Sequence, residues 1–495
     1  MLIKKTKSLC PECLNVIEAN IIEEDGKVMM EKTCPEHGFF KDIYWSDVDL
    51  YRKAEKFVHE GKGVSNPHTR RDKGCPFDCG ICDEHKTTTI LANMDLTNRC
   101  NMHCPICFAD TSHEYLYEPS YEEIGHMLEN LRAERPVPCK AVQFSGGEPT
   151  VRDDLPDIIR KAKELGFMQI QIATNGLKLA ESMEYCRTLR DAGLNTIYLQ
   201  FDGVTPEVYE KTRGFNAWPL KEKAIKNCEQ AGATSICLVP TLVKGINDHQ
   251  VGDIIRYAFE HRKTVRAVNF QPVSFAGRLD YEDLMKMRIT IPDFVKLVEE
   301  QTQGQVGVDD FFTVPSVVPV SHLVEALSGK PQIEFTCHFA CGTATYVFKD
   351  GDKLVPITQF IDVEKMMDYL EDISRESIST LKKPIVGAKI LNKLRQCIDN
   401  DKKPEYLNIT KMLTDILMGN SYLDEFSYEA VLIGCMHFQD AYNFDLERVQ
   451  RCAIHYALPD GRIIPFCPFN TLHRKECELA YAQQKGTVKA KKTDS

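Results

Sequence analysis

Short apolar stretches alternate with segments of helical periodicity between about residues 90 and 273. The apolar stretches predict six strands, at 90–96, 141–145, 168–174, 196–201, 235–242 and 267–273. Helical patterns, such as those at 154–165 and 183–192, lie between them. Repeated βα units at this spacing indicate an α/β fold with a parallel sheet or barrel. Six units rather than eight predict an incomplete barrel that is open to one side.

The regions on either side of these units follow other patterns. After residue 300 the periodicity is lost, and two turn sequences, at 348–353 and 458–463, predict hairpins. Amphipathic helices are expected between about 363 and 432. The sequence therefore predicts four parts: a metal ribbon at 1–50, a connector at 51–89, the barrel at 90–300 and a C-terminal region at 301–495.

Composition and charge narrow the class of protein. Of 495 residues, 43% are hydrophobic and 27% are charged, which is the balance of a soluble globular chain. The net charge of −11 argues against a general nucleic-acid binder, which would need a basic face. No window reaches the roughly 18 apolar residues of a membrane span, and the N-terminus runs directly into a cysteine motif. We therefore expect a cytoplasmic protein without a nucleic-acid partner.

Twenty cysteines are far more than a cytoplasmic chain of this size needs for disulfides. Fourteen of them are clustered along the sequence, which points to metal. Near the N-terminus, two Cys-Pro-x-ligand segments flank a predicted hairpin with its turn at 24–26. They bring together four metal ligands, which are Cys10, Cys13, Cys34 and His37. Zinc and iron share this tetrahedral geometry, so either a zinc ribbon or a rubredoxin-like iron site is consistent with the motif.

A second motif in the connector has the spacing C-x3-C-x2-C and comprises Cys75, Cys79 and Cys82. Such a run turns three thiolates inward, which suits a cubane iron–sulfur cluster better than a single tetrahedral ion. A fourth ligand would then have to come from elsewhere in the chain.

The same spacing recurs at Cys100, Cys104 and Cys107, directly after the first predicted strand. Three thiolates ligate only three irons of a four-iron cube, so the fourth iron keeps an open position, as a catalytic metal requires. At the end of the second strand, Gly146 and Gly147 would allow close approach of a ligand, and Glu148 can accept a hydrogen bond from a ligand ammonium group.

Taken together, these two segments resemble the radical S-adenosylmethionine (radical SAM) superfamily. The resemblance implies that the three cysteines bind a 4Fe-4S cluster and that the Gly-Gly-Glu segment holds the methionine part of SAM. Further contacts to SAM or substrate are implied for Thr174, Asn175, Gln200, Asp202, Asn269 and Gln271. Such a cofactor pair supplies a 5′-deoxyadenosyl radical, which can take hydrogen from an unactivated C–H bond.

Eight clustered cysteines remain, which is the number that two fully ligated auxiliary 4Fe-4S clusters need. They are Cys75, Cys79, Cys82, Cys337, Cys341, Cys435, Cys452 and Cys467. We therefore predict two auxiliary clusters, although one cluster with bystander thiols also satisfies the count. Electrons would come from an external donor of the ferredoxin or flavodoxin type and pass through the ribbon metal and one of these clusters.

Along nearly its full length the chain resembles the archaeal tetraether lipid synthases, a family earlier described as radical SAM pterin methyltransferases. The resemblance rests on the N-terminal ribbon, the motifs GCPFDCGICDEH, DLTNRCNMHCPICFA and FSGGEPT, and the cysteine-bearing C-terminal region. It implies an enzyme that joins the terminal methyl carbons of two phytanyl chains of archaeol-type lipids, with peripheral contact to the membrane.

Two alternatives stay open. One is a radical SAM methyltransferase that acts on a pterin. The other is an electron-transfer protein without a substrate.

Overall fold

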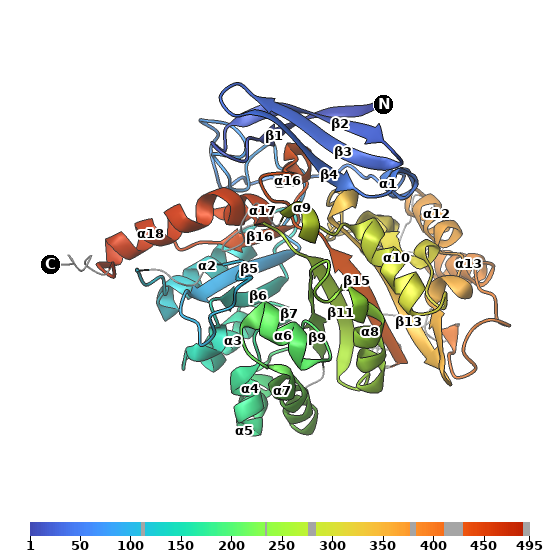
Figure 1. Ribbon diagram of the computed structural model, residues 1–495. Coiled ribbons are helices and arrows are strands. Elements are labelled where there is room, and N and C mark those ends of the chain that lie inside the picture. The colour runs from blue at the N-terminus through green and yellow to red at the C-terminus, as the bar shows by residue number, and fades with distance from the viewer. Residues whose placement is uncertain (110–113, 233–234, 276–283, 377–382, 410–428, 489–495) are drawn as a thin grey trace.

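In the computed structural model, residues 1–109, 114–232, 235–275, 284–376, 383–409 and 429–488 are described. The N-terminal ribbon is an antiparallel sheet at the top of Figure 1. Its strands are β1 (Leu2–Leu9), β2 (Val16–Glu24), β3 (Lys27–Cys34) and β4 (Gly38–Trp45), followed by helix α1 (Val48–Glu55). Asp25 and Gly26 both have positive φ angles between β2 and β3, so the predicted hairpin turn is confirmed.

Six parallel strands form the centre of a second, larger sheet. They are β5 (Leu91–Thr97), β6 (Ala141–Gly146), β7 (Gln169–Thr174), β8 (Thr196–Gln200), β9 (Ile236–Val239) and β11 (Val265–Pro272), and the two-residue β10 (Thr241–Leu242) pairs with β11. Each pairs with the next in chain order. All six predicted strands are thus confirmed, with ends that differ by up to three residues, since the predicted 235–242 is divided into β9 and β10.

The C-terminal region adds strands to both edges of this sheet. Strand β15 (Ala430–Met436) pairs in parallel with β11, and β16 (Ile454–Ala457) pairs in parallel with β5. The remaining strands are β12 (Phe312–Thr313), β13 (Gly342–Asp350), β14 (Lys353–Pro356) and β17 (Ile463–Pro465). The predicted division at residue 300 therefore does not follow the sheet. The apolar edges of β5 and β11 would be exposed without these strands, and that is why the C-terminal region joins the barrel strands rather than folding apart.

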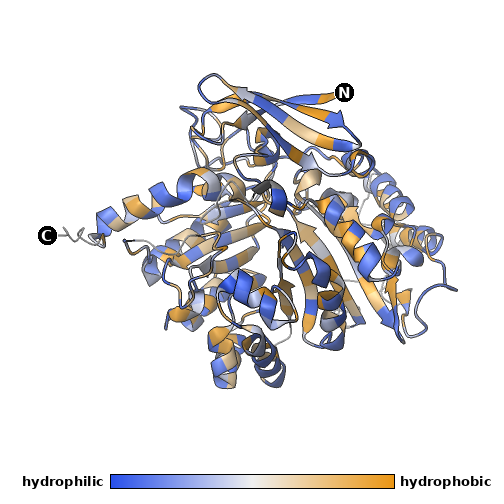
Figure 2. Ribbon diagram, in the orientation of Figure 1, coloured by the Kyte–Doolittle hydropathy of each residue, from blue (hydrophilic) through white to orange (hydrophobic). Residues whose placement is uncertain are grey.

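Helices cover the larger sheet and keep its strands buried. Figure 2 shows hydrophobic residues along the central strands and hydrophilic residues on the outer sides of the helices. In the barrel region the helices are α2 (Tyr121–Ala133), α3 (Leu155–Glu164), α4 (Leu177–Glu181), α5 (Met183–Ala192), α6 (Pro206–Arg213), α7 (Trp218–Gln230), α8 (Val251–Glu260), α9 (Leu284–Met287) and α10 (Ile291–Gln301). In the C-terminal region they are α11 (Val318–Ser328), α12 (Val363–Ser374), α13 (Lys383–Arg395), α16 (Leu446–Gln450), α17 (Phe466–Pro468) and α18 (Arg474–Lys485).

Local signals account for where helices begin and end. Helix α5 begins where the Ser182 side chain accepts a hydrogen bond from the Tyr185 N–H, and it ends at Gly193, which has a φ of 106°. Both predicted helices are confirmed, as α3 and α5. The predicted hairpins are also confirmed, as β13–β14 and β16–β17. Part of the predicted 363–432 helical stretch lies outside the described residues. Helices α12 and α13 occupy 363–374 and 383–395, whereas 396–408 form turns and loops and 430–432 belong to strand β15.

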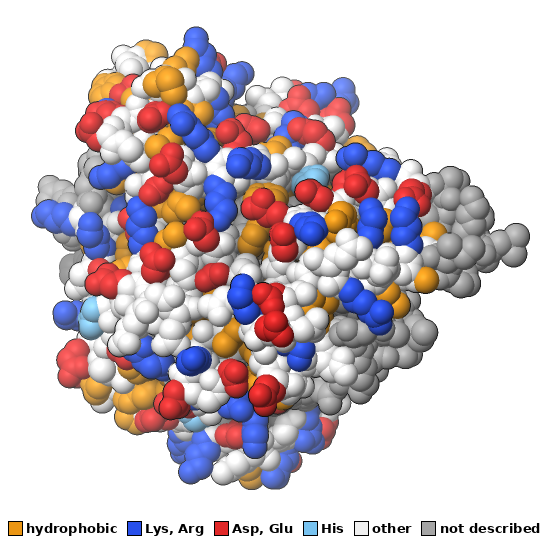
Figure 3. Space-filling model, turned by 90° about the vertical axis from the view of Figure 1, so that its right-hand side faces the viewer, with side chains coloured by type: hydrophobic (Ala, Val, Ile, Leu, Met, Phe, Trp, Pro, Cys, Tyr) orange, Lys and Arg blue, Asp and Glu red, His pale blue; other side chains and the backbone are white. Residues whose placement is uncertain are grey.

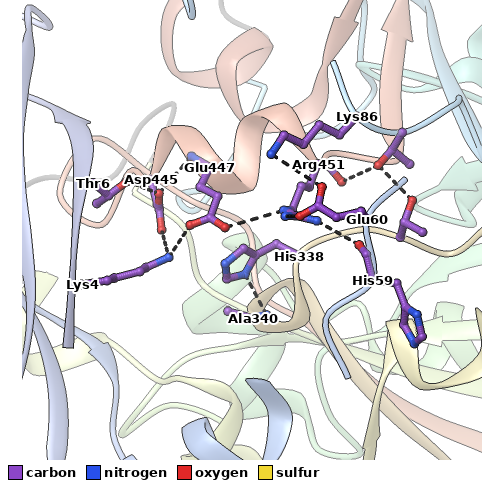
Figure 4. A network of polar contacts seen from close by, with 12 residues as sticks. Lys4, Thr6, His59, Glu60, Lys86, His338, Ala340, Asp445, Glu447 and Arg451 are labelled. Carbon is purple, nitrogen blue, oxygen red and sulfur yellow. Dashed lines mark hydrogen bonds and ion pairs between the residues drawn. The ribbon is translucent and has the colours of Figure 1, made fainter. Parts of the chain in front are cut away.

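Buried ion pairs join the ribbon to the C-terminal region. The Arg288 guanidinium lies 2.7 Å from an Asp42 carboxylate oxygen in β4 and 3.1 Å from Asp440. Lys4 of β1 pairs with Asp445 and Glu447 (Figure 4). On the face seen in Figure 3, by contrast, basic and acidic side chains are interspersed rather than segregated. No helix in the described part of the chain is long and apolar enough to cross a membrane.

Candidate active site and metal centres

A cavity of about 410 Å³ lies among the ends of the parallel strands. Each of the six central strands and β16 contributes to its wall, through Asn93, Ser145, Gln171, Tyr198, Val239, Asn269 and Tyr456. A flat sheet cannot line one cavity from seven strands, so the sheet must curve around it. This curvature agrees with the predicted incomplete barrel.

The three cysteines of the loop after β5 open into this cavity. Cys100, Cys104 and Cys107 all line its wall and all are partly exposed. Burial, together with negative charge on Glu148 and on the other two cysteines, raises the pKa of the Cys100 thiol to about 12. Three thiols that repel one another when ionised need a cation between them, so this donor set fits the predicted iron–sulfur cluster.

Gly146 and Gly147 bring the end of β6 against this cysteine loop. A Cβ atom on Gly146 would lie 2.2 Å from the Thr97 carbonyl oxygen, and one on Gly147 would lie 2.2 Å from that of Arg99. The backbone N–H of Gly147 donates to the Thr97 carbonyl at 2.7 Å. The glycines were expected to admit a ligand, but their immediate function is to let two backbone segments pack directly together.

Glu148 is buried, and its carboxylate joins the ends of two strands. One oxygen accepts hydrogen bonds from the hydroxyls of Thr150 and Thr174 at 2.6 and 2.7 Å. The other accepts from the backbone N–H of Asn175 at 2.7 Å. Burial raises the pKa of Glu148, and these donors offset the rise. The predicted contact with a ligand ammonium group stays a prediction, because the residue already holds the loop after β7 against the loop after β6.

The predicted residue Asp202, which follows β8, pairs with an arginine that the sequence did not single out. Arg213, at the end of α6, donates to both carboxylate oxygens of Asp202, at 2.6 and 2.8 Å. Its guanidinium also contacts the Cys104 thiol, and the negative charge there raises the pKa of Arg213. The Asp202 carboxylate thus balances the charge of Arg213 beside the loop that carries Cys100, Cys104 and Cys107.

The other predicted SAM or substrate contacts fall into two groups. Gln200 accepts a hydrogen bond at 2.7 Å from Lys221, a buried lysine of α7 that also donates to the Asn175 carbonyl. Burial lowers the pKa of Lys221 to about 7. Asn269 and Gln271 both donate to the hydroxyl of Tyr198. Neither Lys221 nor Tyr198 was predicted, because nothing in the local sequence marks a single lysine or tyrosine as facing a cavity.

Four cysteines from three separate segments interact electrostatically with one another. They are Cys337, Cys341, Cys452 and Cys467, and we call them the C-terminal cysteine group. Burial raises the pKa of the Cys452 thiol, and negative charge on Cys467 and Cys341 raises it further. The pKa of Cys337 is raised in the same way by Cys341 and Cys452.

The connector cysteines form a separate group of three. Burial raises the pKa of Cys79, and charge on Cys75, Cys452 and Cys82 adds to the rise. Cys452 therefore lies between the two groups, but it interacts with three thiols of the C-terminal cysteine group and with one of the connector group.

Cys435 was predicted as an auxiliary-cluster ligand, and the structure places it apart from both groups. It lies on β15 within the main hydrophobic core, and Asp293 is the only charged neighbour that shifts its pKa. Its spacing along the sequence resembles that of the ligands, but a central strand turns its side chain into the core. Cys435 therefore lies apart from the two cysteine groups, and its role as a ligand stays a prediction.

The ribbon ligands are brought together as predicted. The ligand atoms of Cys10, Cys13, Cys34 and His37 all lie within 4.8 Å of one another. Cys13 Sγ lies 3.9 Å from Cys34 Sγ, and His37 Nδ1 lies 3.5 Å from Cys34 Sγ. Three thiols and an imidazole at this separation fit one tetrahedral zinc or iron ion.

An aromatic wall extends between the loop that carries Cys100, Cys104 and Cys107 and the C-terminal cysteine group. Phe108 follows Cys107 directly, and its ring stacks on that of Phe466 with centroids 5.6 Å apart. Phe466 precedes Cys467 and stacks on Phe438 at 4.1 Å. All three rings line the cavity.

Comparison with known proteins agrees with this arrangement. The family model described as the radical SAM superfamily matches residues 94–258, and that of the HMPTM N-terminal zinc ribbon domain matches residues 2–46. The three-cysteine loop and the curved parallel sheet are thus those of a radical SAM enzyme that carries an N-terminal zinc ribbon.

More closely related proteins define the family. The chain is 54% identical over 489 residues to 7,8-dihydro-6-hydroxymethylpterin dimethyltransferase of Methanocaldococcus jannaschii, covering 97% of this chain and 96% of that protein. It belongs to the family of that protein. A probable GTP 3′,8-cyclase of Methanothermobacter marburgensis is 31% identical over 177 residues, which is 36% of this chain and 56% of that protein.

Among solved structures, Streptococcus suis SuiB bound to precursor peptide SuiA is similar over 44% of this chain and 46% of that one. Its sequence identity is 16% and its TM-score is 0.37.

Proposed function

We propose that this radical SAM enzyme forms a new carbon–carbon bond at an unactivated carbon of its substrate. The first candidate substrate is a pterin that carries a hydroxymethyl group, as named for the relative from M. jannaschii. The observation that carries the proposal is the cavity into which Cys100, Cys104 and Cys107 open. The aromatic wall of that cavity suits a planar ring, because aromatic rings stack face to face at an offset.

The metal groups are part of this proposal. Cys100, Cys104 and Cys107 would hold the radical SAM cluster, and the C-terminal cysteine group would hold a fully ligated auxiliary 4Fe-4S cluster. Cys75, Cys79 and Cys82 would hold a second auxiliary cluster through three cysteines, and the ribbon would hold one iron or zinc ion. Bound SAM and the first cluster supply a 5′-deoxyadenosyl radical. Electrons would come from a ferredoxin- or flavodoxin-like donor.

The chain's own residues would shape where this radical can react. Glu148 fixes the loops after β6 and β7, and the Asp202–Arg213 pair fixes the loop after β8 beside Cys104. Phe108 and Phe466 restrict water on the open side, where a reactive radical would otherwise be quenched. Each methyl transfer would consume one SAM as the radical source, a second as the methyl donor, and two electrons from the external donor.

A second candidate substrate is the phytanyl chain of an archaeol-type lipid. The apolar side of the cavity favours it, since Ile106, Met436 and Val273 join the aromatic wall there. Joining two methyl carbons removes one hydrogen atom from each, and each hydrogen ends in one 5′-deoxyadenosine. Two SAM molecules and two electrons are therefore consumed for each bond. A lipid substrate would also bring the protein to the membrane surface.

One experiment separates the two substrates. The anaerobically reconstituted protein is reduced and incubated with SAM and either the hydroxymethyl dihydropterin or synthetic archaeol, while 5′-deoxyadenosine and product mass are followed. A pterin heavier by one or two methyl groups supports the first candidate. Loss of two hydrogens per joined chain pair, with two 5′-deoxyadenosines, supports the second. Radical formation that leaves both compounds unchanged would refute both substrates.

A further inference from the structure

Helix α16 places four charged side chains between the ribbon and the C-terminal cysteine group. Asp445 caps its N-terminus, and Glu447, Arg448 and Arg451 lie within or directly after it. Figure 4 shows that the two carboxylates face Lys4 of β1, at 3.3 and 2.8 Å. In the same view Arg451 pairs with Glu60 of the connector. Three of the four charges therefore have partners of opposite sign.

Arg448 is the exception. It is only 1% exposed, and one terminal nitrogen donates to the His437 carbonyl at 2.7 Å. Its guanidinium lies 5.9 Å from the centre of the Tyr44 ring. The Nε atom is buried without a hydrogen-bond partner. Within the described residues, no carboxylate forms an ion pair with Arg448.

The anionic groups beside Arg448 are instead thiols of the C-terminal cysteine group. Arg448 lies beside Cys341, because the residue whose carbonyl accepts its hydrogen bond, His437, donates its own backbone N–H to the Cys341 carbonyl at 3.0 Å. Negative charge on Cys341 and Cys467 favours the protonated form of the guanidinium. The same guanidinium in turn lowers the pKa of Cys467 against the effect of burial. A buried arginine cannot lose its proton, so an uncompensated guanidinium would be strongly destabilising here. An anionic cluster on these cysteines would supply the missing negative charge and an acceptor for Nε.

Arg213 at the radical SAM loop provides the internal comparison. It also contacts a cluster cysteine, Cys104, but both oxygens of Asp202 accept hydrogen bonds from it. The negative charge of Asp202 therefore offsets most of the effect that Arg213 would have on Cys104. At the C-terminal cysteine group the corresponding charge is not neutralised by any carboxylate that the structure describes.

We propose that Arg448 raises the reduction potential of the auxiliary cluster on the C-terminal cysteine group. Reduction adds negative charge to a cluster, so a fixed positive charge and a hydrogen bond to its sulfur atoms stabilise the reduced form. The step is a one-electron transfer from the external donor, and no bond forms or breaks. This inference rests on the proposed auxiliary cluster.

The test is a potentiometric titration followed by low-temperature electron paramagnetic resonance. The parent protein carries Cys100→Ala, Cys104→Ala and Cys107→Ala, so that the radical SAM signal is absent. The paramagnetic resonance signal of the auxiliary cluster on the C-terminal cysteine group is identified as the one that disappears in Cys467→Ala. Arg448 is then replaced by Lys, Gln and Met. Arg132→Met is the matched control, because Arg132 also donates to backbone carbonyls and lies over an aromatic ring, but on α2.

We expect the midpoint potential to fall in the order Arg, Lys, Gln, Met. In Arg448→Met the ratio of reduced to oxidised cluster at the parent midpoint should fall at least tenfold, which corresponds to about 59 mV for a one-electron couple. Arg132→Met should titrate as the parent does. If Gln and Met prevent loading of the cluster, Arg448→Lys decides the proposal, because its midpoint potential should still lie below that of the parent.

Two results would overturn it in different ways. Unchanged midpoints in the Arg448 variants, or equal loss of the cluster in all three, would show that its charge does not act on this cluster. If Cys467→Ala contains as much iron as the parent, the C-terminal cysteine group does not bind the proposed auxiliary cluster.

Discussion

The two cysteine sites nearest the cavity are built in opposite ways. The radical SAM loop takes Cys100, Cys104 and Cys107 from eight consecutive residues at the end of one strand. The C-terminal cysteine group takes its four thiols from three segments, which precede β13, precede β16 and follow β17. The first site needs only a short loop to form, whereas the second forms only when both edge strands have docked on the central sheet.

This difference extends to the charges around each site. Beside Cys104, Asp202 neutralises Arg213, so the loop itself remains nearly neutral apart from its thiols. Beside Cys341, no carboxylate of the described residues forms an ion pair with Arg448, and its charged neighbours are cysteines of the C-terminal cysteine group. A site whose charge balance depends on its metal group should be coupled more tightly to metal loading than one that is balanced without it.

The largest expected effect is on 5′-deoxyadenosine formation, which should depend on the radical SAM loop and not on the C-terminal cysteine group. Cys104→Ala should reduce 5′-deoxyadenosine formation to background, because the cluster that cleaves SAM loses one of three ligands. Cys467→Ala should lose the iron of the C-terminal cysteine group and still form 5′-deoxyadenosine. Iron content and 5′-deoxyadenosine release, measured on both reconstituted variants, check this. Loss of 5′-deoxyadenosine in Cys467→Ala with the first cluster intact would contradict the independence of the two sites.

The sequence predicted the radical SAM loop better than the C-terminal cysteine group, because the first depends on neighbouring residues and the second on distant ones. The six strands, the hairpins and the ligand spacing of the first site depend on neighbouring residues, and the sequence predicted them. The position of Cys435 apart from the other cysteines was not foreseen, because it depends on the pairing of β15 with β11 and β13. Arg213 and Arg448 were missed, since a helix residue carries no local signal of which distant thiol it will meet.

The next effect concerns the charge balance at the radical SAM loop. Arg213→Met leaves the buried Asp202 carboxylate without its cationic partner, and breaking such a pair costs about 3–5 kcal/mol. We expect the free energy of unfolding in urea to fall by this amount. Arg213→Met combined with Asp202→Leu should recover most of the loss. A double variant as unstable as the single one would show that the ion pair is not the cause.

A smaller effect depends on pH and concerns the hydrogen bond between Thr89, at the end of the connector, and Glu134. Glu134 is buried, and its carboxylate accepts from the Thr89 backbone N–H at 2.8 Å, just before β5. Burial raises its pKa to about 7. The unfolded chain loses this proton near pH 4.5 and the folded chain keeps it until about pH 7. Stability should therefore fall by up to about 3 kcal/mol between these values and then level off.

Glu134→Gln should remove this slope and keep the acceptor for Thr89. The check is the urea midpoint at pH 5 and pH 8, with Glu129→Gln, an exposed residue of the same helix, as the control. If Glu134→Gln responds to pH as the natural chain does, the slope comes from other groups.

The smallest effect tests which cysteines belong to the second site. Cys435→Ala removes one buried sulfur atom from the core, and a loss of about 1 kcal/mol is expected from the small cavity that it leaves. Its iron content should equal that of the natural chain, whereas Cys452→Ala should lose cluster iron. The two cysteines are both buried or nearly so and differ mainly in their neighbours, since Cys452 interacts with Cys467 and Cys341 while Cys435 packs in the core. A loss of iron in Cys435→Ala as large as in Cys452→Ala would mean that β15 supplies a ligand, and Cys435 would then join the C-terminal cysteine group.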